Sequence, residues 1–214
     1  MPFVTGALVL LNVAVFFWEL TGADPDRTIA AFATIPYDVS NRITLAPPSP
    51  PDAYLTLITA QFFHASTLHL VSNMIFLAGF GPEVEWLLGH GRFLGFYLLC
   101  GIVGNVVQTM VMPGSHVPSL GASGAIAGVL GGYLIAFPTR PLFLRVPAAL
   151  VILAWAGLQF VHGFGTVAGA GSALSERGGG IAYFTHIGGF LCGVITVGLF
   201  RRREVGARAA RYYR

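Results

Sequence analysis

Six apolar segments dominate the chain, and about 20 consecutive apolar residues are what an α-helix needs to cross the hydrocarbon core of a bilayer. They lie approximately at residues 3–20, 66–88, 92–112, 122–137, 142–163 and 181–200. Charged residues make up 10% of the 214 residues, against roughly 25% in a typical soluble domain. The sequence therefore predicts an all-α membrane protein, with one six-helix membrane domain over residues 1–214 and a short, glycine-rich fourth helix.

The placement of arginine predicts how this domain is oriented in the membrane. All 12 basic residues are arginine, and six of them lie in the tail 201–214. With both termini in the cytoplasm, nine arginines face inward and three, Arg27, Arg42 and Arg177, face outward, as the positive-inside rule favours. We expect a bacterial plasma membrane protein with a basic cytoplasmic tail. No nucleic-acid partner is expected, because the basic residues do not cover a soluble face.

Five polar residues lie within or next to the apolar segments: His64, His69, Asn73, Ser123 and His186. Each has a structural explanation when taken alone, but ionisable and polar groups inside a membrane are costly and mark candidate functional sites. Spans two, four and six run in the same direction, and four of these residues lie near the starts of these spans. They are therefore expected in one layer, below the outer surface.

This layer contains the groups that a serine hydrolase needs. Ser123 is the candidate nucleophile, and His186 is the candidate base that accepts its proton and later protonates the leaving amine. No Asp or Glu is suitably placed to orient His186, so the sequence predicts a Ser–His dyad. His69, Asn73 and the backbone N–H of Ser123 are candidate donors to an oxyanion.

Glycines explain how two helices could bring this pair together. Gly124 and Gly128 are four residues apart in the fourth span, and so are Gly189 and Gly193 in the sixth. Small faces of this kind let helix backbones approach closely. With Gly121 ahead of the serine, these glycines are predicted to support the packing of spans four and six.

These residues together resemble the rhomboid family of intramembrane serine proteases. The resemblance covers roughly Thr56 to Gly193 and rests on four motifs in order. They are His64-x4-His69-x3-Asn73, Gly81-x3-Glu85-x3-Gly89-x-Gly91-Arg92, Gly121-x-Ser123-Gly124 and His186-x2-Gly189-x3-Gly193.

The resemblance implies a six-helix rhomboid-like bundle that cleaves membrane-anchored proteins in or near their transmembrane segments, without a metal or other cofactor. It assigns Ser123 and His186 to catalysis and His69, Asn73 and the Ser123 amide to the oxyanion hole, whereas His64 and Glu85 match structural positions. The sequence departs from the family at several positions. Ala127 stands where many members have an aromatic residue that stacks on the base, Thr185 stands where an alanine is frequent, and a common Trp-Arg pair is absent from the stretch Asp52 to Thr56.

The leading hypothesis is an intramembrane serine endopeptidase in a lipid bilayer, acting on transmembrane protein substrates. Substrates would reach the site sideways past the fifth span, under the glycine-rich loop 164–180. The alternative is a weak or inactive rhomboid-like protein that binds transmembrane helices, which Ala127 slightly favours. A small transporter is disfavoured, because the sequence has neither charged residues at the bilayer midplane nor repeated halves.

Overall fold

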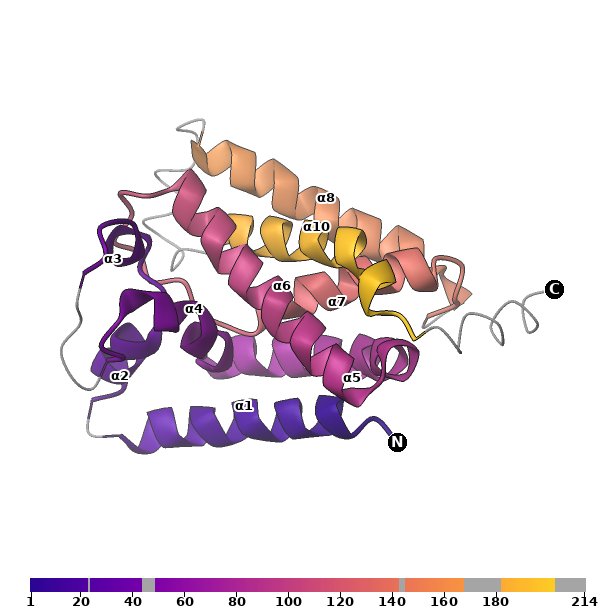
Figure 1. Cartoon of the computed structure of the whole chain (residues 1–214), viewed down its shortest axis with the longest axis horizontal. Helices are drawn as coiled ribbons and strands as arrows, with labels where there is room; N and C mark the ends of the chain where they lie inside the picture. The colour runs from indigo at the N-terminus through magenta and orange to yellow at the C-terminus, as the bar shows by residue number, and fades with distance from the viewer. Residues whose placement is uncertain (23, 44–48, 143–144, 168–181, 203–214) are drawn as a thin grey trace.

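The computed structural model describes residues 1–22, 24–43, 49–142, 145–167 and 182–202, and the regular elements in these ranges are all helices (Figure 1). The long helices are α1 (Phe3–Thr21), α5 (Thr67–Leu88), α6 (His90–Val111), α7 (Ser123–Ala136), α8 (Ala148–Val167) and α10 (Tyr183–Phe200). Between α1 and α5 lie the short helices α2 (Pro25–Phe32), α3 (Pro36–Ser40), η1 (Ala53–Leu55), α4 (Thr56–Thr59) and η2 (Ala60–Phe62).

Four described helices are long and apolar enough to cross a membrane: α1, α6, α8 over Ala148–Gly165, and α10. Large apolar side chains point outward from them, among them Leu10, Leu158, Ile195 and Leu199. Outward apolar surface of this extent is what contact with lipid requires and what a water-soluble monomer avoids. The chain is therefore an all-α, multi-pass membrane protein.

The fifth apolar segment begins later than the sequence predicted. We expected a span from residue 142, but α8 starts at Ala148. Pro141 and Pro147 face each other across a β-bridge, and Arg145 adopts a positive φ of 59°, so the backbone turns there before it becomes helical. At its other end α8 continues to Val167. Most of the loop predicted at 164–180 and of the tail predicted at 201–214 lies outside the described residues.

Helix α7 is the centre of the bundle and packs against α5, α6, α8 and α10. Its 14 residues rise by about 21 Å, which is less than the roughly 30 Å of a bilayer core. The surrounding helices bury it almost completely, because glycine replaces side chains at its contacts. A Cβ on Gly189 would strike the carbonyl oxygen of Gly124, and a Cβ on Gly193 would strike that of Gly128.

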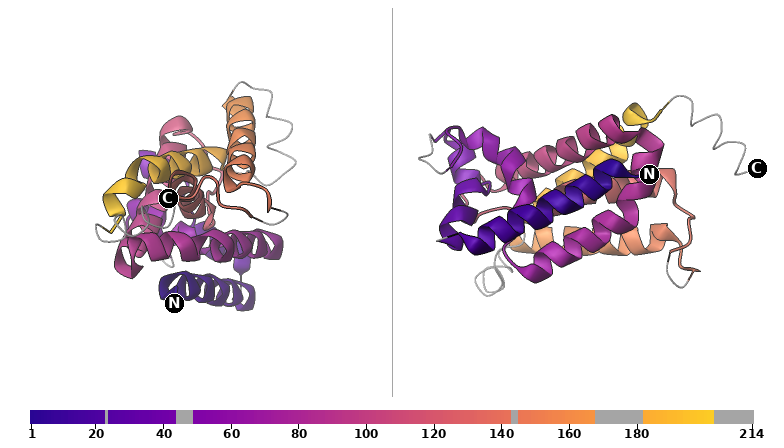
Figure 2. Two further views of the ribbon diagram at one scale, coloured as in Figure 1. Left: turned by 90° about the vertical axis from the view of Figure 1, so that its right-hand side faces the viewer. Right: turned by 90° about the horizontal axis from the view of Figure 1, so that it is seen from below.

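Helix α1 is held on the outside of the bundle by a buried carboxylate on α5. Glu85 accepts hydrogen bonds from the backbone N–H groups of Val4 (2.9 Å) and Thr5 (2.7 Å) and from the Thr5 hydroxyl (2.6 Å). The Glu85 carboxylate thus accepts hydrogen bonds from backbone N–H groups in the first turn of α1, which have no acceptor within the helix. Figure 2 shows α1 against α5 on one side of the molecule and α8 on another side.

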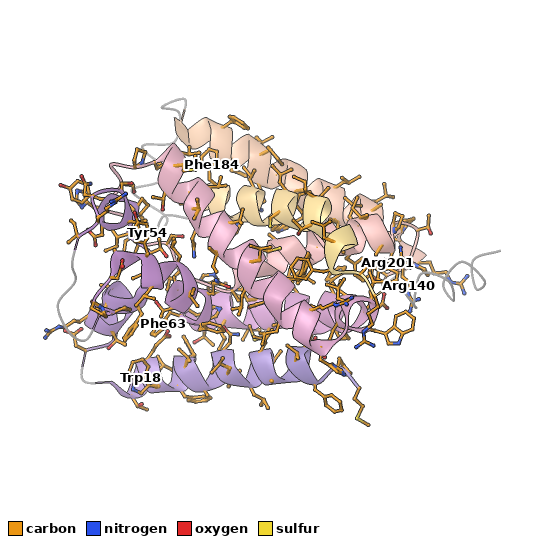
Figure 3. All side chains as sticks on the ribbon, viewed as in Figure 1. Trp18, Tyr54, Phe63, Arg140, Phe184 and Arg201 are labelled. Carbon is orange, nitrogen blue, oxygen red and sulfur yellow. The ribbon has the colours of Figure 1, made fainter. Side chains whose placement is uncertain are left out.

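The bundle has two distinct ends. α1 begins and α10 ends at the same end of the bundle (Figure 1). The Arg92 guanidinium there donates a hydrogen bond to the Arg201 carbonyl oxygen. Arg140 also lies at this end, whereas Trp18, Tyr54 and Phe63 lie at the opposite one (Figure 3). Helices α5, α7 and α10 all begin toward the Phe63 end, so their first turns share one layer of the molecule.

Candidate active site

Ser123 is the first residue of α7, at the end of a loop that is fixed by backbone hydrogen bonds. The loop pairs with the N-terminal segment through Thr34 and Ser119, and the Gly121 N–H donates to the Ala60 carbonyl oxygen at 2.8 Å. Gly121 has a φ of +116°, a conformation that glycine adopts without strain. As a residue in the first turn of a helix, Ser123 has a backbone N–H with no acceptor inside α7.

The hydroxyl of Ser123 lies 2.7 Å from Nε2 of His186, which is in the first turn of α10. Both residues line a cavity of about 900 Å³ that also touches α5 and α8. A neutral imidazole with an unprotonated Nε2 accepts a hydrogen bond from the serine at this distance. The pair thus has the geometry in which a hydroxyl can lose its proton while it attacks an electrophile.

A third side chain contacts the imidazole, and it was not among the residues singled out in the sequence. The Oε1 atom of Gln159, on α8, lies 2.8 Å from Nδ1 of His186. The indole ring of Trp155, one helical turn earlier on α8, lies near the imidazole at a centroid distance of 5.9 Å and a tilt of 38°. The imidazole thus has an aromatic neighbour, Trp155 on α8, although Ala127 on α7 replaces the aromatic residue that many family members have there.

Asn73 and His69 line the same cavity from the first half of α5. Asn73 is buried, and its Nδ2 group has no hydrogen-bond partner among the described residues. A Cβ on Gly121 would lie 2.7 Å from the His69 ring and 3.6 Å from Asn73 Nδ2. Glycine at this position therefore keeps space in front of a free amide donor, where a substrate oxygen could bind.

His64 lies in the loop before α5 and supports the site from behind. Its side chain is fully buried, and its ring packs edge-on against that of His69 at a centroid distance of 5.1 Å. Burial, together with the charge that His69 can carry, lowers the pKa of His64 to about 3, so its ring is neutral. Its Nε2 can therefore accept the Ala122 N–H at 3.5 Å, next to Ser123.

The residues that flank the Ser–His pair are joined by buried hydroxyls. Ser119, in the loop before α7, lies 3.2 Å from the Thr185 hydroxyl and 3.4 Å from Oδ1 of Asn105 on α6. Thr185 immediately precedes His186, and its methyl group would lie 2.6 Å from a Cβ on Gly124. Thr185 is therefore part of the contact that sets the spacing between α7 and α10.

The fold and this cavity define a multi-pass membrane protein with a hydrogen-bonded serine and histidine inside its helical bundle. No group of three or more His, Cys, Asp or Glu among the described residues is arranged to hold a metal ion. The family model of the Rhomboid domain matches residues 51–203, which include every side chain of the cavity named above. The chain belongs to the rhomboid family.

Three similar proteins illustrate the range of this family. The chain is 34% identical to Rhomboid protease GluP of Bacillus subtilis over 152 residues, which cover 71% of this chain and 27% of that protein. It is 30% identical to the mitochondrial Rhomboid protein 1 of Saccharomyces cerevisiae, with 88% of this chain and 51% of that protein covered. It is also 30% identical to the human mitochondrial Presenilin-associated rhomboid-like protein, with 94% and 50% covered.

The chain thus spans about half the length, or less, of these curated relatives. They come from a bacterium and from mitochondria, so membership of the family assigns a membrane protein without assigning one particular membrane.

Proposed function

We propose that this chain is an intramembrane serine endopeptidase that cleaves membrane-anchored proteins in or near their transmembrane segments. The observation that carries the proposal is the 2.7 Å contact between Ser123 Oγ and His186 Nε2 inside a cavity of about 900 Å³. A hydroxyl in hydrogen-bond contact with an imidazole is the arrangement that activates serine as a nucleophile.

In the proposed reaction, Ser123 Oγ attacks the carbonyl carbon of the scissile peptide bond while its proton passes to His186 Nε2. The tetrahedral intermediate collapses as the C–N bond breaks, and the departing amine takes the proton from His186. Water then attacks the acyl-serine ester while His186 Nε2 takes one of its protons. His186 gives this proton to Ser123 Oγ as the ester C–O bond breaks, which releases the carboxylic acid and restores the Ser123 hydroxyl.

The negative oxygen of the tetrahedral intermediate needs donors that are already in place. Asn73 Nδ2 is buried, unpaired among the described residues and adjacent to the cavity, which supports it as the main side-chain donor. The Ser123 backbone N–H at the start of α7 and the His69 ring complete the proposed set.

For the position in the membrane, we propose that α1, α5, α6, α7, α8 and α10 form one six-helix domain with both termini in the cytoplasm. The end with Arg140 and Arg201 faces inward under the positive-inside rule (Figure 3). The cavity lies near the starts of α5, α7 and α10 and opens toward the outer side. Substrate reaches it from the lipid past α8, and a bacterial plasma membrane is the proposed location.

The alternative is a rhomboid-like protein that binds transmembrane helices without cleaving them. Ala127, in place of an aromatic residue, is the observation that favours it. Labelling by a fluorophosphonate separates the two, because a binding protein has no need for a reactive serine. Labelling of the wild type that disappears in both Ser123→Ala and His186→Ala supports the protease.

The direct test measures cleavage of a single-span substrate by the purified protein in liposomes. Ser123→Ala is expected to lower turnover by at least ~10³-fold. The matched control is Thr21→Ala, which removes an exposed hydroxyl at the end of α1 that bonds to the Phe17 carbonyl oxygen. Equal cleavage by wild type and Ser123→Ala would exclude the proposed mechanism.

A further inference from the structure

We infer that Gln159 is the positioning residue of the catalytic base, so that His186 is aligned from α8 through a neutral amide. The inference rests on the proposed function, because it concerns the same Ser123–His186 pair. Its central observation is the 2.8 Å distance between Gln159 Oε1 and His186 Nδ1, on the opposite side of the ring from the 2.7 Å contact with Ser123.

The chemistry of the two ring nitrogens gives this contact its consequence. A neutral imidazole carries one proton, on either Nδ1 or Nε2. An amide oxygen can only accept a hydrogen bond, so Gln159 stabilises the form with the proton on Nδ1. Nε2 is then left with a free lone pair, and that nitrogen faces the Ser123 hydroxyl. Gln159 therefore selects the form of His186 that can act as a base.

The bond also fixes the direction of the ring. Ser123 and Gln159 approach the imidazole from α7 and α8, and a ring held at both nitrogens cannot rotate without losing one contact. Trp155 lies on the same face of α8 as Gln159, because the two residues are four apart. Its indole contacts the imidazole as well, so α8 restrains the base both at its edge and near its face.

A neutral partner suits the environment better than a carboxylate. A charged side chain within a bilayer is costly unless it is paired, and an ionised carboxylate on α8 would lie on an apolar helix of which only 22% is buried inside the protein. Glutamine supplies the acceptor without this cost. Among the described residues that line the cavity, the other titratable group is His69 on α5.

The test compares Gln159→Met and Gln159→Glu with the wild type in liposomes. Methionine keeps the length and flexibility of glutamine but removes the acceptor. We expect Gln159→Met to lower kcat by about ten- to a hundredfold with little change in KM, which corresponds to the loss of a hydrogen bond to a group that becomes charged. The rate of fluorophosphonate labelling should fall by a similar factor.

Gln159→Glu provides a readout that a purely structural role would not change. A carboxylate beside Nδ1 favours the imidazolium form, which cannot accept the serine proton. The acid limb of the pH–rate profile should therefore move to higher pH, by about half a unit or more, with activity retained above it. Leu158→Ala, on the neighbouring and outward face of α8, is the matched control and should follow the wild-type profile.

The outcomes separate the inference from the proposed function. If Ser123→Ala abolishes cleavage but Gln159→Met keeps wild-type kcat, the role of Gln159 is wrong and the protease stands. A Gln159→Glu profile that coincides with that of the wild type overturns the inference in the same way. If Ser123→Ala still cleaves, the proposed function itself fails. Thermal unfolding of each variant, compared with Leu158→Ala, identifies any loss of folded protein.

Discussion

The close contact of α7 with α10 predicts a strong effect for the substitution Gly124→Ala. A Cβ at Gly124 would lie 2.6 Å from the methyl carbon of Thr185, about 0.8 Å short of the 3.4 Å at which ordinary contact begins. Its other neighbours, the Thr185 carbonyl oxygen and the Gly101 Cα, are at 3.5 and 3.9 Å and need no adjustment. The methyl group of Thr185 therefore determines whether α7 and α10 can keep their spacing in the Gly124→Ala variant.

This separation acts directly on the contact between Ser123 and His186, because Gly124 follows Ser123 and Thr185 precedes His186. Moving the helices apart by about 0.8 Å would lengthen the 2.7 Å Ser123–His186 contact to about 3.5 Å, longer than the roughly 2.6–3.2 Å at which a general base takes a proton directly. A misplacement of about 1 Å can cost about a hundredfold in rate. We expect kcat to fall by between ten- and a hundredfold, with a smaller change in KM.

The assay is the steady-state cleavage of a single-span substrate in liposomes, with fluorophosphonate labelling as a second readout. Thr185→Ser removes the clashing methyl group and keeps the hydroxyl that contacts Ser119 at 3.2 Å. The double variant Gly124→Ala/Thr185→Ser should therefore regain most of the lost activity. Gly198→Ala, where a Cβ would have no neighbour within 4 Å, is the control. Wild-type kcat in Gly124→Ala, or no recovery in the double variant, would refute the reasoning.

Three further predictions follow from the site and its supports. Asn73→Ala should lower kcat by about 10²–10³-fold with KM nearly unchanged, because an oxyanion donor acts mainly in the transition state; unchanged turnover would remove Asn73 from this role. Cleavage should decline once the pH is low enough to protonate His186, since an imidazolium cannot accept the serine proton; a rate that stays constant over the whole acid range in which the protein remains folded would exclude His186 as the base. Glu85→Gln should lower the free energy of unfolding by about 1–3 kcal/mol, measured by chemical or thermal denaturation, because charged acceptors at the start of α1 are lost; equal stability would show that these bonds contribute little.

Much of this arrangement follows from patterns that are visible in the sequence. Apolar length predicts the long helices, and the order of the segments places the starts of α5, α7 and α10 in one layer. Ser123, His186, His69 and Asn73 do line one cavity. Glycine spacing on α7 and α10 indicates which two helices approach most closely, since the missing side chains are the condition for that approach.

Gln159 was missed for a physical reason. It lies inside an apolar helix and belongs to no motif, and the direction in which it points depends on how α8 is rotated and tilted against α10. Hydropathy carries no information about this rotation, which is set by side-chain packing. The sequence did contain one indication of its role. A polar amide side chain within a membrane helix is energetically costly and marks a candidate functional residue, and Gln159 lies four residues after Trp155, on the same helix face. Helix α8 also supplies Trp155, whose ring contacts His186 in place of the aromatic side chain that Ala127 does not provide.

The exposure of α8 has a consequence for the conditions under which the protein acts. In its most apolar 18 residues 22% of α8 is buried inside the protein, against 50% for α10, so in a bilayer α8 is expected to present more of its surface to lipid than α10 does. A helix in this position adjusts its tilt to the thickness of the bilayer around it. Gln159 and Trp155 move with that helix, whereas Ser123 and His186 belong to the glycine-packed centre. For the proposed protease, lipid thickness and fluidity are therefore expected to change the reaction rate through the position of α8.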